Sequence, residues 1–425
     1  MSLYDSFAFS AQGYNHIKVD KECQDASMMY SDDDMSIIVV ADGHGSDNYP
    51  RTASGSVFAA EETIKSIKSF VQTLNKSQIP FDVNDGQNKQ LTELAKNILL
   101  NWHNRVDEDI NNKPFTIDEV EKVSEKYKSI YLSEDANAQE KKAKAYGSTL
   151  IAVCITKEYW FGTQIGDGKC VVFDNLLECS EPIPWDDECQ GNQTTSICDS
   201  DAIDEFRYYK DQELPMAVFI GCDGVDGSYS NDNEFHLLYR NILNIFAEYG
   251  ADKGRDEVNG FLPNLSKKGS GDDVSIAGII KRGISPNTID YIKTQIEYEN
   301  AVAAFERIEK ESAVAKEKYD YINVALQKAR NSLAEDEDKL KKAELECKQK
   351  TVELSEAEKR RDEAVRALET ARIAYGVFSK PDSETDNESS GVIFEELNEE
   401  QVPNEPESED GPVADISHSS DESVE

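Results

Sequence analysis

The stretch Ser36-Ile-Ile-Val-Val-Ala-Asp-Gly-His-Gly45 decides the fold of this chain. A short β-branched run that ends in a glycine-rich turn is typical of a buried strand that presents polar side chains at its end. Acids also follow the apolar run at residues 215–221 and precede the one at residues 274–280. Because ionised aspartates repel one another, acids that gather at strand ends usually bind a hard divalent cation, Mg²⁺ or Mn²⁺. The acids at these three strand ends are Asp42, Asp223, Asp226, Asp272 and Asp273.

Composition divides the 425 residues into three regions. Residues 1–283 mix apolar runs, glycines and aromatics and predict a globular domain, residues 288–378 predict a helical rod, and residues 379–425 form an acidic tail. The formal net charge of −39 argues against nucleic acid or an anionic membrane as the partner. The chain shows neither a secretion signal nor an apolar run that could span a bilayer, so we expect a soluble cytoplasmic protein with reduced cysteines.

Six short runs are expected to be strands, and turn-like residues connect several of them. Two long helical patterns, Arg51 to Leu74 and Lys89 to Ile110, follow the first acidic turn. Strands joined by short turns, with helices arriving in pairs, favour antiparallel sheets covered by helices over a Rossmann fold. The sequence has no glycine-rich nucleotide-binding loop at a strand-to-helix turn. The expected strands are Ile37–Val40, Leu150–Ile155, Tyr159–Ile165, Cys170–Phe173, Val218–Gly221 and Ser275–Ile280.

Five motifs occur in order between residues 7 and 282. They are Val39-Val-Ala-Asp-Gly-His-Gly45, Tyr146-Gly-Ser-Thr-Leu150, Gln164-Ile-Gly-Asp-Gly168, Gly221-Cys-Asp-Gly224 and Gly271-Asp-Asp-Val-Ser275. In these motifs the chain resembles the metal-dependent serine/threonine phosphatases of the protein phosphatase 2C type, and residues 13–26 are similar to their bacterial branch. The resemblance implies an α+β fold of two packed antiparallel β-sheets flanked by helices, here followed by a coiled coil and a disordered tail. It also implies hydrolysis of phosphoserine or phosphothreonine in a phosphoprotein substrate.

The resemblance implies the chemistry of the site as well. A hydroxide that bridges two Mg²⁺ or Mn²⁺ ions would attack the phosphorus, and the ions would neutralise charge on the phosphoryl group. Asp42 would bridge the ions, and His44, with an ordinary pKa of about 6.5, would protonate the departing oxygen. The implied metal ligands, which include the carbonyl of Gly43 and a third, weaker ion at Asp167, are Asp25, Asp42, Gly43, Asp167, Asp223 and Asp272.

The chain departs from the family's pattern at two positions. Gln24 is neutral where many relatives have glutamate, and Asp20 stands where a phosphate-binding arginine is expected. We expect Arg51 to supply the missing cation, because a guanidinium binds phosphate through two hydrogen bonds. His16 and Lys18 are the alternatives. The departures leave open a second function, that of a catalytically weak scaffold that binds phosphoproteins.

The residues in and near these motifs could also have purely structural roles. Asp-Gly is a common turn dipeptide, so each acid taken alone could shape a hairpin, and only the ordered set argues for a metal site. Asp226 and Asp273 are expected beside the site rather than as ligands. The segment from Trp185 to Phe206 is expected to be a flap that selects substrates, or else an ordinary surface loop.

A heptad repeat of two apolar columns continues through the rod and predicts a coiled coil. Homodimerisation is the first expectation, a hairpin that folds near Asp336 is the second, and a different partner protein is the third. The acidic tail is expected to be disordered because it has too few apolar residues to offset the entropy of folding. Within it, Val392-Ile-Phe-Glu-Glu-Leu397 is expected to be a docking motif or a passive remnant.

Overall fold

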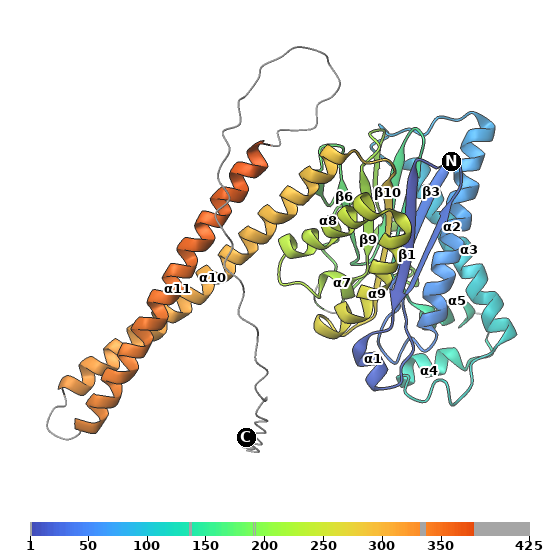
Figure 1. Ribbon diagram of the computed structural model, residues 1–425. Coiled ribbons are helices and arrows are strands. Elements are labelled where there is room, and N and C mark those ends of the chain that lie inside the picture. Colours follow the sequence, from blue (N-terminus) through green and yellow to red (C-terminus); the bar gives the residue numbers. More distant parts are fainter. Residues whose placement is uncertain (1, 136–137, 190, 192, 332–336, 378–425) are drawn as a thin grey trace, which may run out of the picture. The chain divides into compact units, whose positions relative to one another are not determined.

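The computed structural model describes residues 2–135, 138–189, 191, 193–331 and 337–377 (Figure 1). Within these residues ten strands form two five-stranded sheets in which every pairing is antiparallel. Sheet A has the order β1-β10-β9-β6-β7, and sheet B has the order β2-β3-β4-β5-β8. The strands are β1 (Tyr4–Ala11), β2 (Ala26–Ser31), β3 (Met35–Ala41), β4 (Leu150–Thr156), β5 (Trp160–Ile165), β6 (Lys169–Phe173), β7 (Cys179–Ser180), β8 (Arg207–Asp211), β9 (Ala217–Gly221) and β10 (Val274–Lys281).

The stretch that opens at Ser36 lies in β3, and its side chains are buried on both faces of sheet B. Alternate residues of a strand point to opposite faces. Ile38 and Val40 belong to the hydrophobic core shared with sheet A, whereas Ile37 and Val39 pack in the core beneath the helices on the outer face. A strand covered on both sides is apolar at nearly every position, which explains the run from Ile37 to Ala41.

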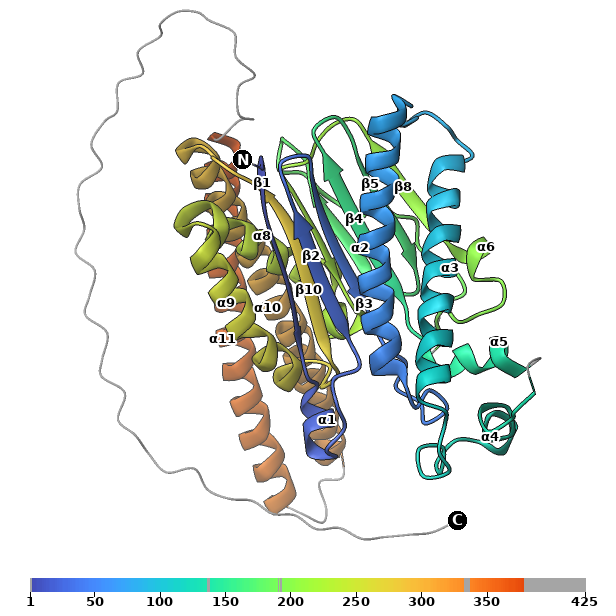
Figure 2. The same ribbon diagram turned by 90° about the vertical axis from the view of Figure 1, so that its right-hand side faces the viewer.

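Two pairs of helices cover the outer faces of the sheets (Figure 2). Sheet B is covered by α2 (Thr52–Ser77) and α3 (Lys89–Asn112), and sheet A by α8 (Asp232–Tyr249) and α9 (Ala251–Lys268). This arrangement confirms the expected α+β class and all six expected strands. The shorter helices are α1 (Tyr14–Lys18), α4 (Glu125–Tyr131), α5 (Gln139–Lys142), the 3-10 helix η2 (Ala143–Tyr146), α6 (Ala202–Glu205) and α7 (Asp223–Asp226).

Two long helices, α10 (Pro286–Asn331) and α11 (Glu337–Val377), pack against each other within the chain. Cys347 Sγ donates to Asn323 Oδ1 over 3.0 Å, and Arg360 lies 3.8 Å from Glu311. This is the hairpin that ranked second among the expected arrangements, and homodimerisation stays a prediction. The expected turn at Asp336 and the tail with its motif at residues 392–397 lie outside the described residues.

The first turns of α10 pack into the core of sheet A. Ile292 is fully buried there, and Arg240 of α8 is only 4% exposed. Arg240 donates to Gln295 Oε1 over 2.6 Å and to Glu299 Oε1 over 2.9 Å. We call residues 286–299 the root of α10. The division of domains near residues 283 and 288 stays a prediction, but the root packs as part of the sandwich.

Two expectations drawn from composition concern the cysteines and the membrane. The eight cysteines are free thiols. Among the described residues, no helix combines the length and the apolar character that crossing a bilayer requires.

Candidate functional site

The acidic strand ends converge on one edge of the two sheets. In an antiparallel pair, the end of one strand lies beside the start of its neighbour. Ala41 pairs with Ala26, and Gly221 pairs with both Ile276 and Lys169, so the turns that follow or precede these residues meet. They line a cleft of about 770 Å³. The predicted residues in its lining are His16, Asp42, Gly43, His44, Asp167, Asp223 and Asp272.

Asp25 is absent from the described residues that line the cleft, but its carboxylate lies close to that of Asp42. Ligand atoms of Asp25, Asp42 and Cys222 all lie within 4.8 Å of one another. Burial, followed by the negative charge of Asp273, raises the pKa of Asp25 to about 7. Burial also raises the pKa of Asp42, and the charges of Asp25 and Asp223 act in the same direction. The fold therefore holds these carboxylates together against their repulsion, which a divalent cation would relieve.

Asp167 and Asp223 extend the acidic lining. Asp167 lies between β5 and β6, next to Gly166, whose φ of 99° favours glycine. Burial, followed by the charge of Asp223, raises the pKa of Asp167 to about 6. Asp223 is exposed at the start of α7, two residues after β9. The two carboxylates act on each other electrostatically, as expected of groups that share a cation.

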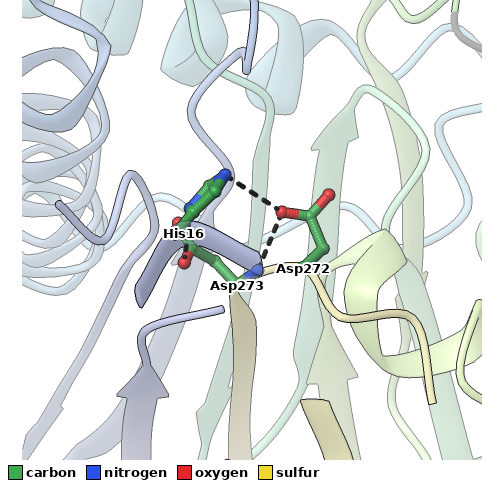
Figure 3. Close-up of side chains that lie close together, drawn as sticks. All are labelled: His16, Asp272 and Asp273. Carbon is green, nitrogen blue, oxygen red and sulfur yellow. Dashed lines mark hydrogen bonds and ion pairs between the residues drawn. The ribbon is translucent and has the colours of Figure 1, made fainter. Parts of the chain in front are cut away.

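Asp272 and Asp273 are neighbours with different surroundings (Figure 3). The buried Asp273 carboxylate accepts from the N–H groups of Gly13 over 2.5 Å and Gln24 over 2.6 Å, and lies 2.9 Å from His16 Nδ1. Asp272 is 58% exposed and lies 3.7 Å from His16 Nε2. Asp273 thus ties the loop that carries Gln24 to the start of β10, whereas Asp272 remains open to a cation.

The turn after β3 is fixed by the segment that precedes β4. The Thr149 N–H donates to the Asp42 carbonyl over 2.8 Å, and the Asp42 N–H donates to Thr149 Oγ1 over 3.1 Å. Ser148 Oγ donates to the same carbonyl over 2.9 Å. A Cβ on Gly43 would come within 2.4 Å of the Gln24 carbonyl oxygen, so only glycine fits there. The Gly-Ser-Thr motif therefore positions Asp42 through its backbone.

His44 lies in the cleft directly after this turn. Its Nε2 lies 2.7 Å from Ser196 Oγ, and its ring packs edge-on to Tyr49 with the centroids 4.6 Å apart. Burial, followed by the positive charge of Lys144, lowers the pKa of His44 to about 4, while the charge of Asp199 opposes the shift. The imidazole is therefore neutral near pH 7 unless an anion approaches it.

The structure corrects the preference for Arg51 as the phosphate-binding cation. Its guanidinium donates to Glu119 over 2.5 and 3.0 Å and to Tyr146 Oη over 2.6 Å, and it lies 3.5 Å from Asp109. Arg51 is absent from the described residues that line the cleft. Because its donors are already engaged by two carboxylates, Arg51 anchors the start of α2 instead of facing the substrate.

The two alternatives to Arg51 are placed differently. His16 lines the cleft, but its ring is engaged by Asp273. Lys18 does not contribute to the lining: its Nζ lies 4.2 Å from the centroid of the Tyr14 ring and donates to Asn15 Oδ1. Neither residue offers an unengaged positive charge to the cleft.

Sequence reasoning missed two lysines that line the cleft, Lys21 and Lys144. Lys144 is paired with Asp199 over 2.9 Å. Lys21 Nζ donates to the Gly45 carbonyl over 2.7 Å and forms no ion pair within the part of the chain that the structure describes. A signal was available, because Lys21 adjoins Asp20, where the family's arginine is expected.

The segment from Trp185 to Phe206, here called the flap, contributes residues between Glu188 and Glu205 to the lining of the cleft. Beside it, Arg207 at the start of β8 donates to the Pro184 carbonyl over 3.0 Å, which holds the two ends of the flap together. The flap thus lies where a loop that contacts the substrate would lie. The role of the flap in selecting substrates stays a prediction.

The residues present fit a hard divalent cation. Gln24 Oε1, Asp25 Oδ2 and Asp226 Oδ1 are buried and have no hydrogen-bond partner among the described residues. Buried oxygens without partners are costly, and carboxylate or amide oxygens are the ligands that Mg²⁺ and Mn²⁺ prefer. The Gln24 amide oxygen can therefore take the place of the expected glutamate without contributing its charge.

Comparison with known proteins identifies the family to which this chain belongs. The model of the family described as protein phosphatase 2C matches residues 12–262, which is more than half of the chain. No curated protein matches the chain. The solved serine/threonine phosphatase Stp1 from Staphylococcus aureus is 13% identical, with a TM-score of 0.40 over 67% of this chain and 98% of that one. PstP/Ppp from Mycobacterium tuberculosis is 11% identical, with a TM-score of 0.38 over 66% and 99%. The catalytic domain of PstP in complex with two manganese ions is 12% identical, with a TM-score of 0.38 over 65% and 99%.

Proposed function

Because this chain belongs to the protein phosphatase 2C family and is a metal-dependent protein-serine/threonine phosphatase, we propose that the acidic cleft is its active site. The observation that carries the proposal is that Asp42 and Asp223, from two separate turns, line one cleft, while the buried carboxylate of Asp25, outside the described lining, lies within 4.8 Å of that of Asp42 and has an unpartnered oxygen. The substrate is a phosphoserine or phosphothreonine residue of another protein.

We propose that two divalent ions bind in this cleft and that the Asp42 carboxylate would help to hold both. When bound, the ions would supply a nucleophile from water near neutral pH and neutralise charge on the transferring phosphoryl group. The chain contributes a rigid arrangement of ligands: Thr149 fixes the backbone of Asp42, and Asp273 fixes the loop that leads to Asp25. The proposed ligands are Asp25, Asp42, the Gly43 carbonyl, Asp223 and Asp272, with Asp167 for a third, weaker ion.

His44 is the proposed general acid. The fold keeps its ring neutral by burial, so it needs a negative charge close by before it can hold a second proton near pH 7. A bound phosphate dianion supplies that charge. Proton uptake by His44 would then accompany substrate binding, and the ring would protonate the departing serine or threonine oxygen.

We assign binding of the substrate phosphate to Lys21 in place of Arg51. Lys21 lies in the cleft without a carboxylate partner among the described residues, whereas Lys144 is neutralised by Asp199. An unpaired ammonium group in a cleft of carboxylates is free to bind an incoming anion.

Metal-dependent turnover is the direct test of this function. Purified protein with Mn²⁺ is expected to hydrolyse p-nitrophenyl phosphate and a phosphoserine peptide, and Asp42→Ala or Asp223→Ala is expected to lower turnover by about a hundredfold or more. Asp118→Ala, at an exposed position outside the cleft lining, is the matched control. Wild-type turnover no higher than that of the Asp42 variant would favour the alternative, a scaffold that binds phosphoproteins without hydrolysing them.

We also propose that the hairpin of α10 and α11 associates with a second copy or with a partner protein. Tyr321 and Ile373 are 76% and 70% exposed on it, and Leu345 and Val352 are more than half exposed. Apolar side chains on a packed helical pair are commonly covered by another chain. Sedimentation equilibrium tests self-association: a dimer that Tyr321→Lys weakens is expected, and a monomer at all concentrations would leave only a different partner.

A cytoplasmic location is part of the proposal. Eight free thiols fit a reducing compartment. Cell fractionation is the test, and recovery of the protein from a membrane or secreted fraction would contradict it.

A further inference from the structure

We propose that Thr195 of the flap is the positioning residue for Asp167, so that binding of the third, weaker ion depends on how the flap is packed. The inference rests on the metal site proposed above. Thr195 is 7% exposed, and its Oγ1 accepts a hydrogen bond of 2.9 Å from the N–H of Gly166, the residue before Asp167. Thr195 and Gly166 are 29 positions apart in the chain, so the flap must be seated against this turn for the contact to exist.

The hydrogen bonds of the Thr195 hydroxyl have only one possible set of directions. Asp186 Oδ2 lies 2.8 Å from Thr195 Oγ1, and an ionised carboxylate can only accept, so the hydroxyl donates its single proton to Asp186. Burial opposes ionisation of Asp186, but hydrogen bonds from the Glu188 N–H and the Thr195 hydroxyl outweigh it and lower the pKa of Asp186. The lone pairs of Thr195 Oγ1 therefore face the Gly166 N–H, which can only donate. Cys189 Sγ lies 3.9 Å from the same oxygen and makes a weaker contact.

Arg207, at the start of β8, closes a ring of contacts around Gly166. Its guanidinium donates to the Gly166 carbonyl and lies 3.8 Å from Asp186 Oδ2. Gln164 of β5 donates to the same carbonyl over 3.1 Å. Both polar groups of the Gly166 backbone are thus held, the N–H by Thr195 and the C=O by Arg207 and Gln164. Because these groups flank the Cα of Gly166, holding both fixes the course of the chain into Asp167.

The flap also contacts Asp167 itself. The side chain of Thr194 hydrogen-bonds to the Asp167 carboxylate, and both residues line the cleft. Groups that orient a metal ligand without touching the metal commonly change its affinity tenfold or more when they are removed. Thr195 has this relation to Asp167, because it holds the backbone from which the carboxylate extends.

The coupling between the flap and Asp167 acts in both directions. A packed flap that strengthens binding at Asp167 is itself stabilised by that binding, and the factor is the same. A substrate that displaces the flap would therefore lower the affinity of Asp167 for its ion. The contact at Thr195 thus connects the part of the cleft expected to select substrates with the metal site.

Equilibrium binding of Mn²⁺ separates this positioning role from a general loss of structure. Free aqueous Mn²⁺ has a sharp electron paramagnetic resonance signal, so a titration counts the bound ions and gives their dissociation constants without turnover. Thr195→Val keeps the shape of the side chain and removes its hydroxyl. In the full chain we expect the dissociation constant of the weakest ion to rise about tenfold and those of the tighter ions to stay within about twofold.

Two variants and a control accompany this measurement. Thr195→Ser keeps the hydroxyl and should bind every ion within about twofold of wild type, whereas Thr195→Ala should reproduce the selective loss without crowding the turn. Adding Thr195→Val to Asp167→Asn should cause no further change, because Thr195 acts through Asp167. Thr73→Val, at an exposed position of α2 outside the cleft lining, is the matched control and should leave every dissociation constant unchanged.

A loss confined to the weakest ion in Thr195→Val and Thr195→Ala supports the proposal. Equal weakening of all ions, a loss in Thr195→Ser as large as that in Thr195→Val, a further loss in the double variant, or unchanged binding would each overturn it. Wild-type protein that binds only two ions and still hydrolyses a phosphoserine peptide would overturn this inference and leave the proposed function intact. Wild-type protein without Mn²⁺-dependent turnover would refute the proposed function itself, and this inference with it.

Discussion

Lys21 is an unpaired positive charge in a cleft lined mainly by carboxylates, so its effect can be isolated by substitution. Lys21→Met keeps the length of the side chain and removes the charge. The KM for p-nitrophenyl phosphate is expected to rise about tenfold with a smaller change in kcat, because a hydrogen bond from a charged donor to the phosphate is lost. Steady-state kinetics measure this.

Lys21→Arg should restore most of the affinity, and Lys267→Met is the control. Lys267 lies beside the Tyr14 ring and does not contribute to the cleft lining. An unchanged KM in Lys21→Met would remove Lys21 from the substrate-binding residues.

His236 on α8 should make stability depend on pH. Its Nε2 lies 2.7 Å from Glu181 Oε1. Burial opposes the charged ring, but hydrogen bonds to Cys179 and Glu181 outweigh it and raise the pKa of His236 to about 10. A raised pKa means that the folded state binds the proton more tightly, so this contribution is complete below about pH 6.5 and is lost as pH rises toward 10.

Urea denaturation of wild type and His236→Gln measures this dependence. We expect a difference of about 1 kcal/mol at pH 6, allowing for partial exposure, and a smaller one at pH 9.5. His103→Gln is a control of opposite sign, because burial lowers the pKa of His103, so wild type should lose stability relative to that variant as pH falls. A difference for His236→Gln that grows with pH would contradict the assignment.

The aspartates of the site could be predicted from the sequence, but the positively charged side chains that face the cleft could not. Asp42 and Asp223 follow apolar runs directly, so strand pairing alone brings them together. The sequence did not indicate that the Arg51 side chain binds Glu119 instead of facing the cleft, because Glu119 lies 68 residues away in the chain.

Among the elements, buried strands were predictable and edge strands were not. β3 is apolar at nearly every position because both of its faces are covered. β8, at the edge of sheet B, reads Arg-Tyr-Tyr-Lys-Asp and is only partly buried throughout. A strand with one solvated face need not contain an apolar run, so β2 and β8 resembled loops in the sequence.

Arg240 connects α8 to the root of α10, and its loss should weaken this junction. Arg240→Met would leave Glu299 partly buried without its cation, which is expected to cost about 2 to 3 kcal/mol of the free energy of unfolding in urea titrations. The double variant Arg240→Met, Glu299→Gln should recover part of the loss. Lys96→Met, at an exposed position of α3, should change stability by less than about 0.5 kcal/mol. An unchanged free energy of unfolding in Arg240→Met would show that the junction contributes little to stability.

The heptad pattern of the whole rod predicted a packed seam but could not name the partner. Apolar columns are satisfied equally by a second chain or by a second helix of the same chain. Leu326 on α10 and Ala357 on α11 are buried within the single chain. The preference for a dimer over a hairpin relied on the lack of Gly or Pro near Asp336, and other residues can also form a turn.

Two shortened chains separate the root of α10 from the rest of the rod. A chain ending at Arg282 lacks Tyr291 and Ile292, which are buried in the core of sheet A, and is expected to lose about 4 kcal/mol or more of stability. A chain ending at Asn300 keeps the root and should retain turnover of p-nitrophenyl phosphate. Thermal melting and kinetics compare the two with the full chain. Equal melting temperatures for the chain ending at Arg282 and the full chain would show that the root is not part of the core.

The pairing of β1 with β10 joins Tyr4 to Lys281. During synthesis, β1 must therefore wait for β10 before it can pair within sheet A. Closing so long a loop is slow, because its entropy is lost before the contacts form. Tyr4 and Phe7 of β1, which are buried in the finished fold, therefore stay exposed until translation has passed residue 281. In that interval they are binding sites for chaperones.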